Sequence, residues 1–310
     1  MLRKLLAPIA TLALGLALTA PAHAADQTVR IGYQKYGVFT LLKARGTLEK
    51  KLEGQGWKVS WTEFPGGPQL LEALNVGAVD FGLTGEAPPV FAQAAGAQLV
   101  YVANEPPAPQ AEAILVPKDS PIKSVKDLKG KKVALNKGSN VHYLLVKALE
   151  EAGLKLSDIQ PVYLPPADAR AAFAKGAVDA WVIWDPYLAA AEAQLSVRTL
   201  RDGKGLVNNY QFILASRKFA TSQTGIVKTV LNELQVTDQW ANANTAEAAK
   251  ELSQQIGLPV EVVASTLPRN TLGLQSVSPQ VAAQQQKIAD TFHDLGLIPV
   301  AVKVQDALLK

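Results

Sequence analysis

The segment Asn136–Asn140 ends in a serine and an asparagine that stand directly before the pattern of an amphipathic helix. The apolar residues of this pattern recur at helical spacing, at Val141, Leu144, Leu145, Ala148 and Leu149. Ser139 or Asn140 suits the N-cap of the helix, and Gly153 suits its end. The free N–H groups and the positive dipole at such a start can bind an oxyanion. Ordinary capping explains the same residues, so this segment alone leaves both interpretations open.

A second polar helix start follows the first predicted strand of the chain, at Gln34 and Tyr36. Both side chains can form hydrogen bonds, and Gly37 permits close approach of the backbone to a ligand. Two helix starts that face each other could hold one anion between them without any formal positive charge. A plain turn between a strand and a helix is the alternative for this segment.

Two apolar strand patterns end in acids, the first at Glu86 and the second at Trp184-Asp185. Trp184 suits an apolar wall beside a ligand tail, since an aromatic face buries a large area. A core position like that of Trp181 is the alternative, but alternation along a strand places Trp181 and Trp184 on opposite faces. A carboxylate beside a bound anion would repel it. We therefore expect both acids to accept backbone N–H groups, to pair with a basic side chain across a cleft or to bind an amino group, with a structural or closure role favoured.

The elements that must position these residues are indicated by a repeat, because Gly77–Asp80 recurs as Gly176–Asp179. Each copy follows a short amphipathic run and precedes an apolar strand. The expected strands lie at 28–33, 57–64, 80–84, 112–117, 132–136, 161–164, 180–184 and 210–216, and the expected helices at 38–52, 66–75, 123–132, 141–152, 168–175, 225–240 and 279–295. Alternating strands and helices are typical of βαβ units around a largely parallel sheet. The repeat therefore predicts two similar α/β lobes with a cleft between them.

The order of these elements also predicts the boundaries of the lobes. We expect residues 25–114 and 215–310 to form a discontinuous first lobe and residues 115–214 to form the second. Strands near 112–117 and 210–216 would cross between the lobes and act as a hinge that permits closure around a ligand. Asp168 is expected to cap the helix at 168–175, and Arg170 to be a solvated charge.

The residues that catalysis or metal binding would need are largely missing. The chain has no cysteine and three histidines, His23, His142 and His293, which lie far apart in the sequence. Soft metal sites would have almost no ligands, and no nucleophile elbow, phosphate loop or dinucleotide fingerprint occurs. We therefore expect a protein that is not an enzyme and that has no metal and no cofactor.

The first 24 residues have the layout of a secretory signal peptide, with Arg3 and Lys4, an apolar run and a small-x-small cleavage site ending at Ala24. Removing Arg3 and Lys4 lowers the net charge from +4 to about +2, which argues against nucleic acid or an anionic membrane as the main partner. The absence of cysteine excludes a lipid-anchoring cysteine at the cleavage site. We expect a free, monomeric protein in the periplasm.

At these residues the chain resembles the periplasmic aliphatic sulfonate-binding proteins of ABC transporters. The motifs that carry the resemblance are VRIGYQKYG (29–37), WTEFPGGP (61–68), TGEAPP (84–89), NKGSNVHY (136–143) and WVIWDPY (181–187). The resemblance covers the whole mature chain and weakens after about residue 217. It implies the type II periplasmic binding protein fold, in which two βαβ lobes joined by two hinge strands enclose a ligand cleft.

The resemblance also implies a function and a set of ligand-binding residues. The function is capture of alkanesulfonates and their delivery to a membrane permease, whose ATPase subunit powers import as a sulfur source. The residues carried over by motif are Gln34, Gly85, Glu86, Gly138, Ser139, Asn140, Trp184 and Asp185. Binding proteins for taurine and nitrate, and an enzyme of the thiamine-precursor type, share the architecture and are the alternatives. Taurine would need an acid for its ammonium group, and the enzyme would need a reactive lysine and histidine array.

Overall fold

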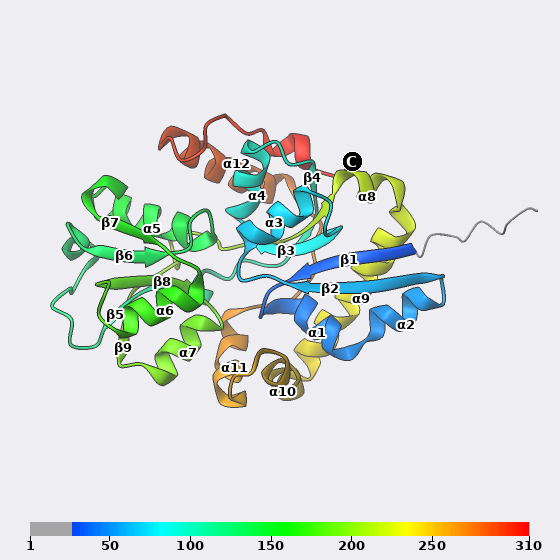
Figure 1. The fold of residues 1–310 in the computed structure, drawn as a ribbon, viewed down its shortest axis with the longest axis horizontal. Helices are drawn as coiled ribbons and strands as arrows, with labels where there is room; N and C mark the ends of the chain where they lie inside the picture. Colours follow the sequence, from blue (N-terminus) through cyan, green and yellow to red (C-terminus); the bar gives the residue numbers. More distant parts are fainter. Residues whose placement is uncertain (1–26, 310) are drawn as a thin grey trace, which may run out of the picture.

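Two five-stranded sheets form the two lobes of the molecule (Figure 1). The computed structural model describes residues 27–309. The predicted signal peptide, residues 1–24, and the predicted start of the mature chain at Ala25 lie outside the described residues.

The first sheet has the strand order β2-β1-β3-β10-β4. Its strands are β1 (Gln27–Tyr33), β2 (Trp57–Glu63), β3 (Phe81–Gly85), β4 (Leu99–Asn104) and β10 (Gln211–Ser216). Strands β2 and β3 run parallel to β1, whereas β10 is antiparallel to both β3 and β4. A strand from late in the chain therefore lies inside the sheet of the first lobe.

The second sheet repeats this arrangement with the order β7-β6-β8-β5-β9. Its strands are β5 (Glu112–Pro117), β6 (Lys132–Leu135), β7 (Gln160–Tyr163), β8 (Ala180–Trp184) and β9 (Val197–Asp202). Strands β7 and β8 are parallel to β6, and β5 is antiparallel to β8 and β9. The prediction of two matching α/β lobes is thus confirmed.

The chain crosses between the lobes at 105–111 and 203–210, a few residues before the predicted hinge strands. The first residue of β5, Glu112, is already paired with Trp184 of the second sheet, and the first residue of β10, Gln211, is paired with Gly85 of the first. Strands β5 and β10 therefore belong wholly to one sheet each. The predicted boundaries at 114 and 214 cut through both strands, because an apolar run does not reveal which sheet will hydrogen-bond to it.

The helices of the first lobe are α1 (Gly37–Arg45), α2 (Thr47–Glu53), α3 (Gly67–Asn75) and α4 (Pro88–Ala94). The single helix predicted at 38–52 is wrong, because Gly46 adopts a left-handed conformation with φ of 60° and divides it into α1 and α2. Helix α4 and strand β4 were not predicted from the sequence.

The helices of the second lobe are α5 (Asn140–Glu151), α6 (Pro166–Ala174) and α7 (Tyr187–Gln194), with the short 3-10 helices η1 (Pro109–Ala111), η2 (Val125–Leu128) and η3 (Leu156–Asp158) beside them. The surface helix predicted at 123–132 is only the 3-10 turn η2. Asp168 does not cap α6 as predicted, because Pro165 is at the N-cap and the aspartate lies in the first turn.

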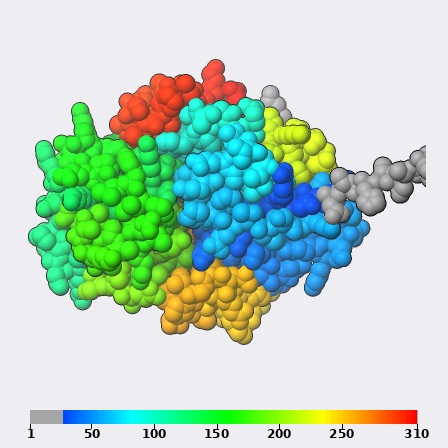
Figure 2. Space-filling model, in the orientation of Figure 1, coloured from blue at the N-terminus to red at the C-terminus, as the bar shows by residue number. Residues whose placement is uncertain are grey.

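The segment after β10 is helical and contacts both lobes. Its helices are α8 (Arg217–Ser222), α9 (Thr224–Ala243), α10 (Thr245–Ile256), α11 (Val260–Thr266), η4 (Leu267–Arg269), α12 (Pro279–Asp294) and η5 (Val304–Ala307). Helix α9 packs on α1 and α2, whereas α11 packs on α7 of the second lobe. Figure 2 shows the orange atoms of this segment bridging the lower edge of the boundary between the lobes. On the opposite edge, Phe292 of α12 contacts Phe91 of α4 and Tyr143 of α5.

The repeated Gly-Ala-Val-Asp segments form equivalent turns. Gly77 and Gly176 have φ angles of 73° and 69°, which favour glycine. Asp80 accepts a hydrogen bond from the backbone N–H of Arg30 at 2.9 Å, and Asp179 accepts one from that of Lys132 at 2.8 Å. Each aspartate thus fixes its turn to the neighbouring parallel strand, which confirms that the repeat shapes two matching turns.

Candidate functional site

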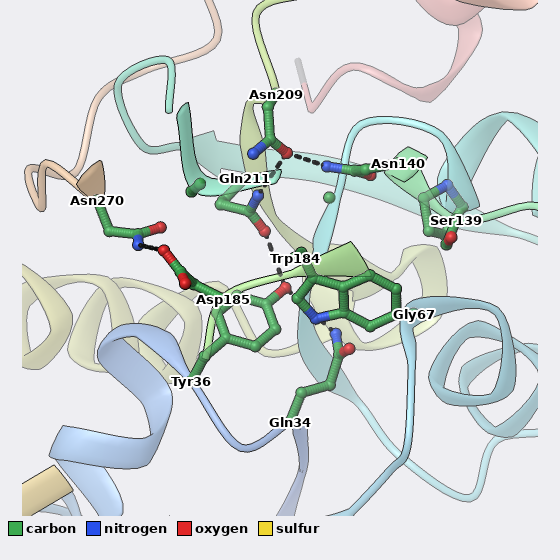
Figure 3. A pocket seen from close by; sticks show the side chains of 13 residues that line it. Gln34, Tyr36, Gly67, Ser139, Asn140, Trp184, Asp185, Asn209, Gln211 and Asn270 are labelled. Atoms are coloured by element: carbon green, nitrogen blue, oxygen red, sulfur yellow. Dashed lines mark hydrogen bonds between the residues drawn. The ribbon is translucent and has the colours of Figure 1, made fainter. Parts of the chain in front are cut away.

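A cavity lies between the lobes, at the edge where β3 and β8 end (Figure 3). The residues that line it are Gln34, Tyr36, Gly67, Gly85, Pro88, Ala111, Ser139, Asn140, Trp184, Asp185, Asn209, Gln211 and Asn270. None of these described lining residues is a lysine, an arginine or a histidine. The cavity wall therefore consists mainly of neutral hydrogen-bonding groups, together with the aromatic rings of Tyr36 and Trp184 and the carboxyl group of Asp185.

Most of the residues predicted to form the site lie on this wall, and two do not. The structure brings together six of the predicted residues, which are Gln34, Gly85, Ser139, Asn140, Trp184 and Asp185. Glu86 and Gly138 are not among the residues that line this cavity. The N–H of Gly138 donates to Nδ1 of His142 at 3.3 Å, and a Cβ atom on this glycine would point to the ring of Phe91. This N–H is consequently turned to the interior and not to the cleft.

A chain of hydrogen bonds connects the polar side chains across the cavity (Figure 3). The hydroxyl of Tyr36 accepts from Gln34 at 3.4 Å and donates to Oε1 of Gln211 at 2.8 Å. The amides of Gln211 and Asn140 both donate to Oδ1 of Asn209. The chain begins in the first lobe and reaches the start of α5 in the second. Burial raises the pKa of Tyr36 above its usual value, so its hydroxyl stays protonated and can donate.

The start of α5 does not use its side chains as an ordinary cap. Ser139 is at the N-cap, yet its hydroxyl donates to the carbonyl of Asn136 at 2.7 Å and accepts no bond from the helix. Oδ1 of Asn140 accepts from the backbone N–H of Ala87 in the first lobe at 3.3 Å. Both side chains are almost fully buried at the cavity wall. This geometry argues against the capping interpretation of these two side chains.

Gly85 makes the contact between the lobes possible. A Cβ atom at this position would lie 2.0 Å from Oδ1 of Asn140, well inside van der Waals contact. An added side chain would displace the Asn140 amide from its bonds to Ala87 and Asn209. The glycine therefore leaves room for this contact between the lobes.

Trp184 and Trp181 lie on opposite faces of β8. Trp181 is fully buried and packs beside Phe173. Trp184 is only partly buried, lines the cavity and lies edge-on to Tyr187 with 6.1 Å between ring centroids. Figure 3 shows its indole near the centre of the side chains that line the cavity. The alternation predicted for this strand is confirmed, and Trp184 is the aromatic wall.

Asp185 connects the second lobe to the C-terminal segment. Its Oδ2 lies 3.0 Å from Nε of Arg269, and its Oδ1 accepts from Nη2 of Arg269 at 3.0 Å. The backbone N–H of Ala189 donates to the same carboxylate at 3.1 Å. Arg269 also pairs with Glu192 at 2.9 Å. Burial raises the pKa of Asp185 to about 7, against the opposing effect of Arg269. The predicted pairing with a basic side chain is therefore present, and we call Asp185, Glu192 and Arg269 the latch.

Glu86 occupies the equivalent place in the first lobe but points into the protein. Its Oε2 accepts from the backbone N–H of Tyr210 at 2.9 Å, and Oε1 has no hydrogen-bond partner among residues 27–309. Burial raises its pKa to about 7, although the backbone N–H groups of Tyr210 and Asn209 oppose the rise. Burial and the neighbouring Glu86 also raise the pKa of Glu112 well above its usual value. Glu86 is thus a structural acid near the crossings between the lobes.

The sequence interpretation missed several residues of the wall. Gly67 and Pro88 lie inside motifs named above but were not selected. Asn209, Gln211 and Asn270 belong to no motif, and Ala111 has no polar side-chain group. Asn209 has a positive φ of 53°, which only the structure reveals. Its position just before a predicted strand was the one available signal.

Among residues 27–309, metal-ligand clusters and the surroundings of His142 bear on the chemistry of the site. No cluster of three or more potential metal ligands occurs in residues 27–309. The ring of His142 is buried among Phe91, Tyr163 and Phe292, and burial lowers its pKa to about 4. Within the same range, the helices are too short or too polar to cross a membrane.

Several known proteins are similar to this chain in sequence and in structure. The model of the NMT1/THI5 like family matches residues 53–248. A protein of Escherichia coli (strain K12), whose name assigns it to the aliphatic sulfonates-binding proteins, is 48% identical over 289 residues, or 93% of this chain and 90% of that protein. The periplasmic aliphatic sulphonate binding protein SsuA from Escherichia coli has a similar crystal structure, with a TM-score of 0.83, 48% identity and coverage of 92% of this chain and 93% of that one. The alkanesulfonate-binding protein SsuA from Xanthomonas axonopodis pv. citri, bound to MOPS, has a TM-score of 0.88, 46% identity and coverage of 92% and 99%.

Proposed function

Because this chain belongs to the aliphatic sulfonate-binding proteins, within the NMT1/THI5 like family, we propose that its cavity captures alkanesulfonates for an ABC transporter. The protein would release the ligand to a membrane permease, and the ATPase subunit of the transporter would power import as a sulfur source. The observation that carries this proposal is the cavity wall, which combines neutral hydrogen-bond donors with the indole of Trp184.

A sulfonate fits this wall because it spreads one charge over three oxygens. The amides of Asn140, Asn209 and Gln211 each donate one N–H within the protein and keep a second for a ligand. The backbone N–H groups at the start of α5 add donors without a fixed cation. Oriented dipoles in a buried site stabilise an anion in place of its lost hydration. A sulfonate also has a hydrocarbon end, for which the indole of Trp184 provides an apolar surface.

The alternatives fit less well. Taurine needs a carboxylate for its ammonium group, but Asp185 is occupied by Arg269, and Glu86 lies outside the cavity wall. Nitrate has no use for an aromatic wall. The thiamine-precursor type of enzyme would need a histidine at the site, and His142 is turned to the aromatic interior. We therefore propose binding without catalysis.

We further propose that the lobes move on the crossings at 105–111 and 203–210, with residues up to 104 and from 211 in the first lobe. The described arrangement has the lobes in contact, through Ala87 and Asn140 and through the latch. Closure of this kind would bury the sulfonate and create the surface that docks on the permease. Since the related SsuA of Escherichia coli is periplasmic, we propose that this protein is exported to the periplasm, with a signal peptide that ends at Ala24, and acts there as a free monomer.

The experiment that tests this function is a thermal-shift panel on the mature protein. A ligand at 100 times its dissociation constant adds about 2.7 kcal/mol to the free energy of unfolding, which is a measurable shift in Tm. We expect C2 to C5 alkanesulfonates to raise Tm, and nitrate, sulfate and taurine to raise it less. Stabilisation by nitrate or sulfate alone would refute the assignment, and turnover of any panel compound would refute the absence of catalysis.

A matched pair of variants tests the place of the site. Ser139→Trp fills the cavity at the start of α5 and is expected to abolish the Tm shift with sulfonates while the protein still folds. Ser222→Trp, at an exposed position at the end of α8, is the control and should keep the full shift. Unchanged affinity of a folded Ser139→Trp variant would remove this helix start from the site.

A further inference from the structure

A second cavity, with about 550 Å³ of empty volume, lies behind the first. Its wall is mainly apolar and comes from α1, α10, the segment from α11 to η4, and the stretch that follows. The apolar residues are Leu41, Leu252, Ile256, Val263, Leu267 and Leu272. We call this space the rear chamber. The sequence gives no motif for it, because its wall comes mainly from the C-terminal region, where the motifs end.

The rear chamber adjoins the first cavity through shared wall residues. Tyr36, Asp185, Gln211 and Asn270 line both spaces. In Figure 3, Asn270 and Asp185 lie on the opposite side of the first cavity from Ser139. Nδ2 of Asn270 donates to the carbonyl of Thr266 at 3.0 Å, whereas its contact with Oδ2 of Asp185 is long, at 3.4 Å. A small shift of the Asn270 side chain would connect the two cavities.

We propose that the rear chamber receives the hydrocarbon tail of a sulfonate whose headgroup is held near Ser139, an inference that rests on the proposed function. The preferred substrates are then sulfonates with tails of several carbons. A tail that points from the Ser139 end of the cavity toward Asn270 enters the chamber when the Asn270 side chain turns away from Asp185. Trp184 then flanks the first carbons, and the leucines of α10 and η4 surround the later ones.

The charged residues on the chamber wall also affect which sulfonate tails can bind. Glu105 lines the chamber and is 4% exposed, and its Oε1 has no hydrogen-bond partner in the described part of the chain. Burial and the neighbouring Asp238 raise the pKa of Glu105 well above its usual value. A carboxylate at the far end of a tail would lose its hydration beside this acid. Lys35 also lines the chamber, but its ammonium group is 3.6 Å from Glu63. The chamber therefore disfavours tails that end in an anion.

The first test is calorimetric titration of the mature protein with methanesulfonate, butanesulfonate and hexanesulfonate. Each methylene that enters an apolar site strengthens binding by about fourfold. We expect hexanesulfonate to bind at least 100-fold more tightly than methanesulfonate. The same tail ending in a carboxylate, 6-sulfohexanoate, should lose most of that gain. Equal affinity for methanesulfonate and hexanesulfonate would overturn the inference.

Variants of the chamber wall provide the second test. Val263→Phe fills the chamber, and Val260→Phe adds the same ring on the exposed side of the same helix as a control. We expect Val263→Phe to bind methanesulfonate with wild-type affinity. The ratio of its affinities for hexanesulfonate and methanesulfonate should fall at least tenfold, whereas the control should keep the wild-type ratio. Leu267→Ala, at a partly buried position, removes chamber wall without overpacking and should weaken hexanesulfonate about tenfold. If the folded variants keep the wild-type ratio of the two affinities, the tail does not enter the chamber.

Sulfonate binding itself tests the proposed function, whereas its dependence on tail length and on the chamber variants tests the role of the rear chamber. If none of the sulfonates binds, the proposed function fails and the inference fails with it. If methanesulfonate binds but tail length and the chamber variants have no effect, the function stands and the rear chamber is not part of the site.

Discussion

The ends of β3 and β8 occupy the same place in two matching lobes, yet their residues make different contacts. Strand β3 ends in Gly85-Glu86, where the glycine leaves room for Asn140 and the acid turns into the protein. Strand β8 ends in Trp184-Asp185, where the ring lines the cavity and the acid pairs with Arg269. Burial raises the pKa of each acid to about 7.

The difference comes from the partners that each strand end meets. Glu86 meets the backbone of Tyr210 at a crossing between the lobes, and Asp185 meets a guanidinium group from the C-terminal segment. Equivalent positions in a repeat therefore share backbone geometry but not chemistry. Three substitutions at or beside these strand ends test this division of roles.

The largest effect is expected at Gly85. In Gly85→Ala, the added Cβ occupies the space of the Asn140 amide and displaces it from Ala87 and Asn209. Losing two buried hydrogen bonds should weaken sulfonate affinity by about 100-fold, measured by calorimetry. The control is Gly225→Ala in α9, where an added Cβ would meet nothing within 4 Å. Wild-type affinity in Gly85→Ala would show that contact between the lobes at this glycine is unnecessary.

A smaller effect is expected when the latch is broken. Arg269→Met leaves the carboxyl group of Asp185 buried without its cation. This destabilises the arrangement with the lobes in contact, although protonation of Asp185 limits the cost. We expect sulfonate affinity to fall by about tenfold, since binding requires this arrangement.

Two further variants control for the latch. Arg170→Met, which removes an exposed arginine bonded to Gln194 within the second lobe, should leave affinity unchanged. The double variant Arg269→Met, Asp185→Asn removes both charges and should recover part of the loss. If the double variant is as weak as the sum of the single ones, the two residues do not act as a pair.

The smallest effect is expected at Glu86 and depends on pH. Its pKa is about 7 in the folded protein and about 4.5 when exposed, so the folded state binds the proton more tightly. The tighter binding of this proton stabilises the folded protein fully below pH 4.5, and this stabilisation is lost as the pH rises through 7. Glu86→Gln mimics the protonated acid and should raise the free energy of unfolding by about 1 kcal/mol at pH 8, with little change at pH 4.5.

Denaturant unfolding at the two pH values measures this effect, with the exposed Glu72→Gln as the control. Sulfonate affinity should be unchanged in Glu86→Gln, because the side chain does not line the cavity. A loss of affinity would place Glu86 in the site after all, and equal stabilisation at both pH values would refute the pKa argument.

Much of the fold and part of the site could be predicted from local patterns. The apolar stripe after Asn140 predicted α5 within one residue at each end, and the spacing of Trp181 and Trp184 predicted which ring leaves the core. The prediction failed at 38–52, where a glycine in a left-handed conformation divides one apolar pattern into two helices. It also missed α7, β9, α10 and α11, whose short or small-residue patterns do not stand out.

By itself, the sequence determined the two-lobe architecture, the matching turns and the helix start beside the site, because these depend on residues within a few positions of each other. Three features depend on tertiary packing. The N–H of Gly138 faces the interior, the side chain of Glu86 points away from the cavity, and Arg269 pairs with Asp185. Tertiary packing also brought Asn209, Gln211 and Asn270 to the wall and formed the rear chamber. The physical reason is that periodicity sets backbone conformation and the facing of side chains within an element, whereas the partner of a side chain depends on how distant segments pack.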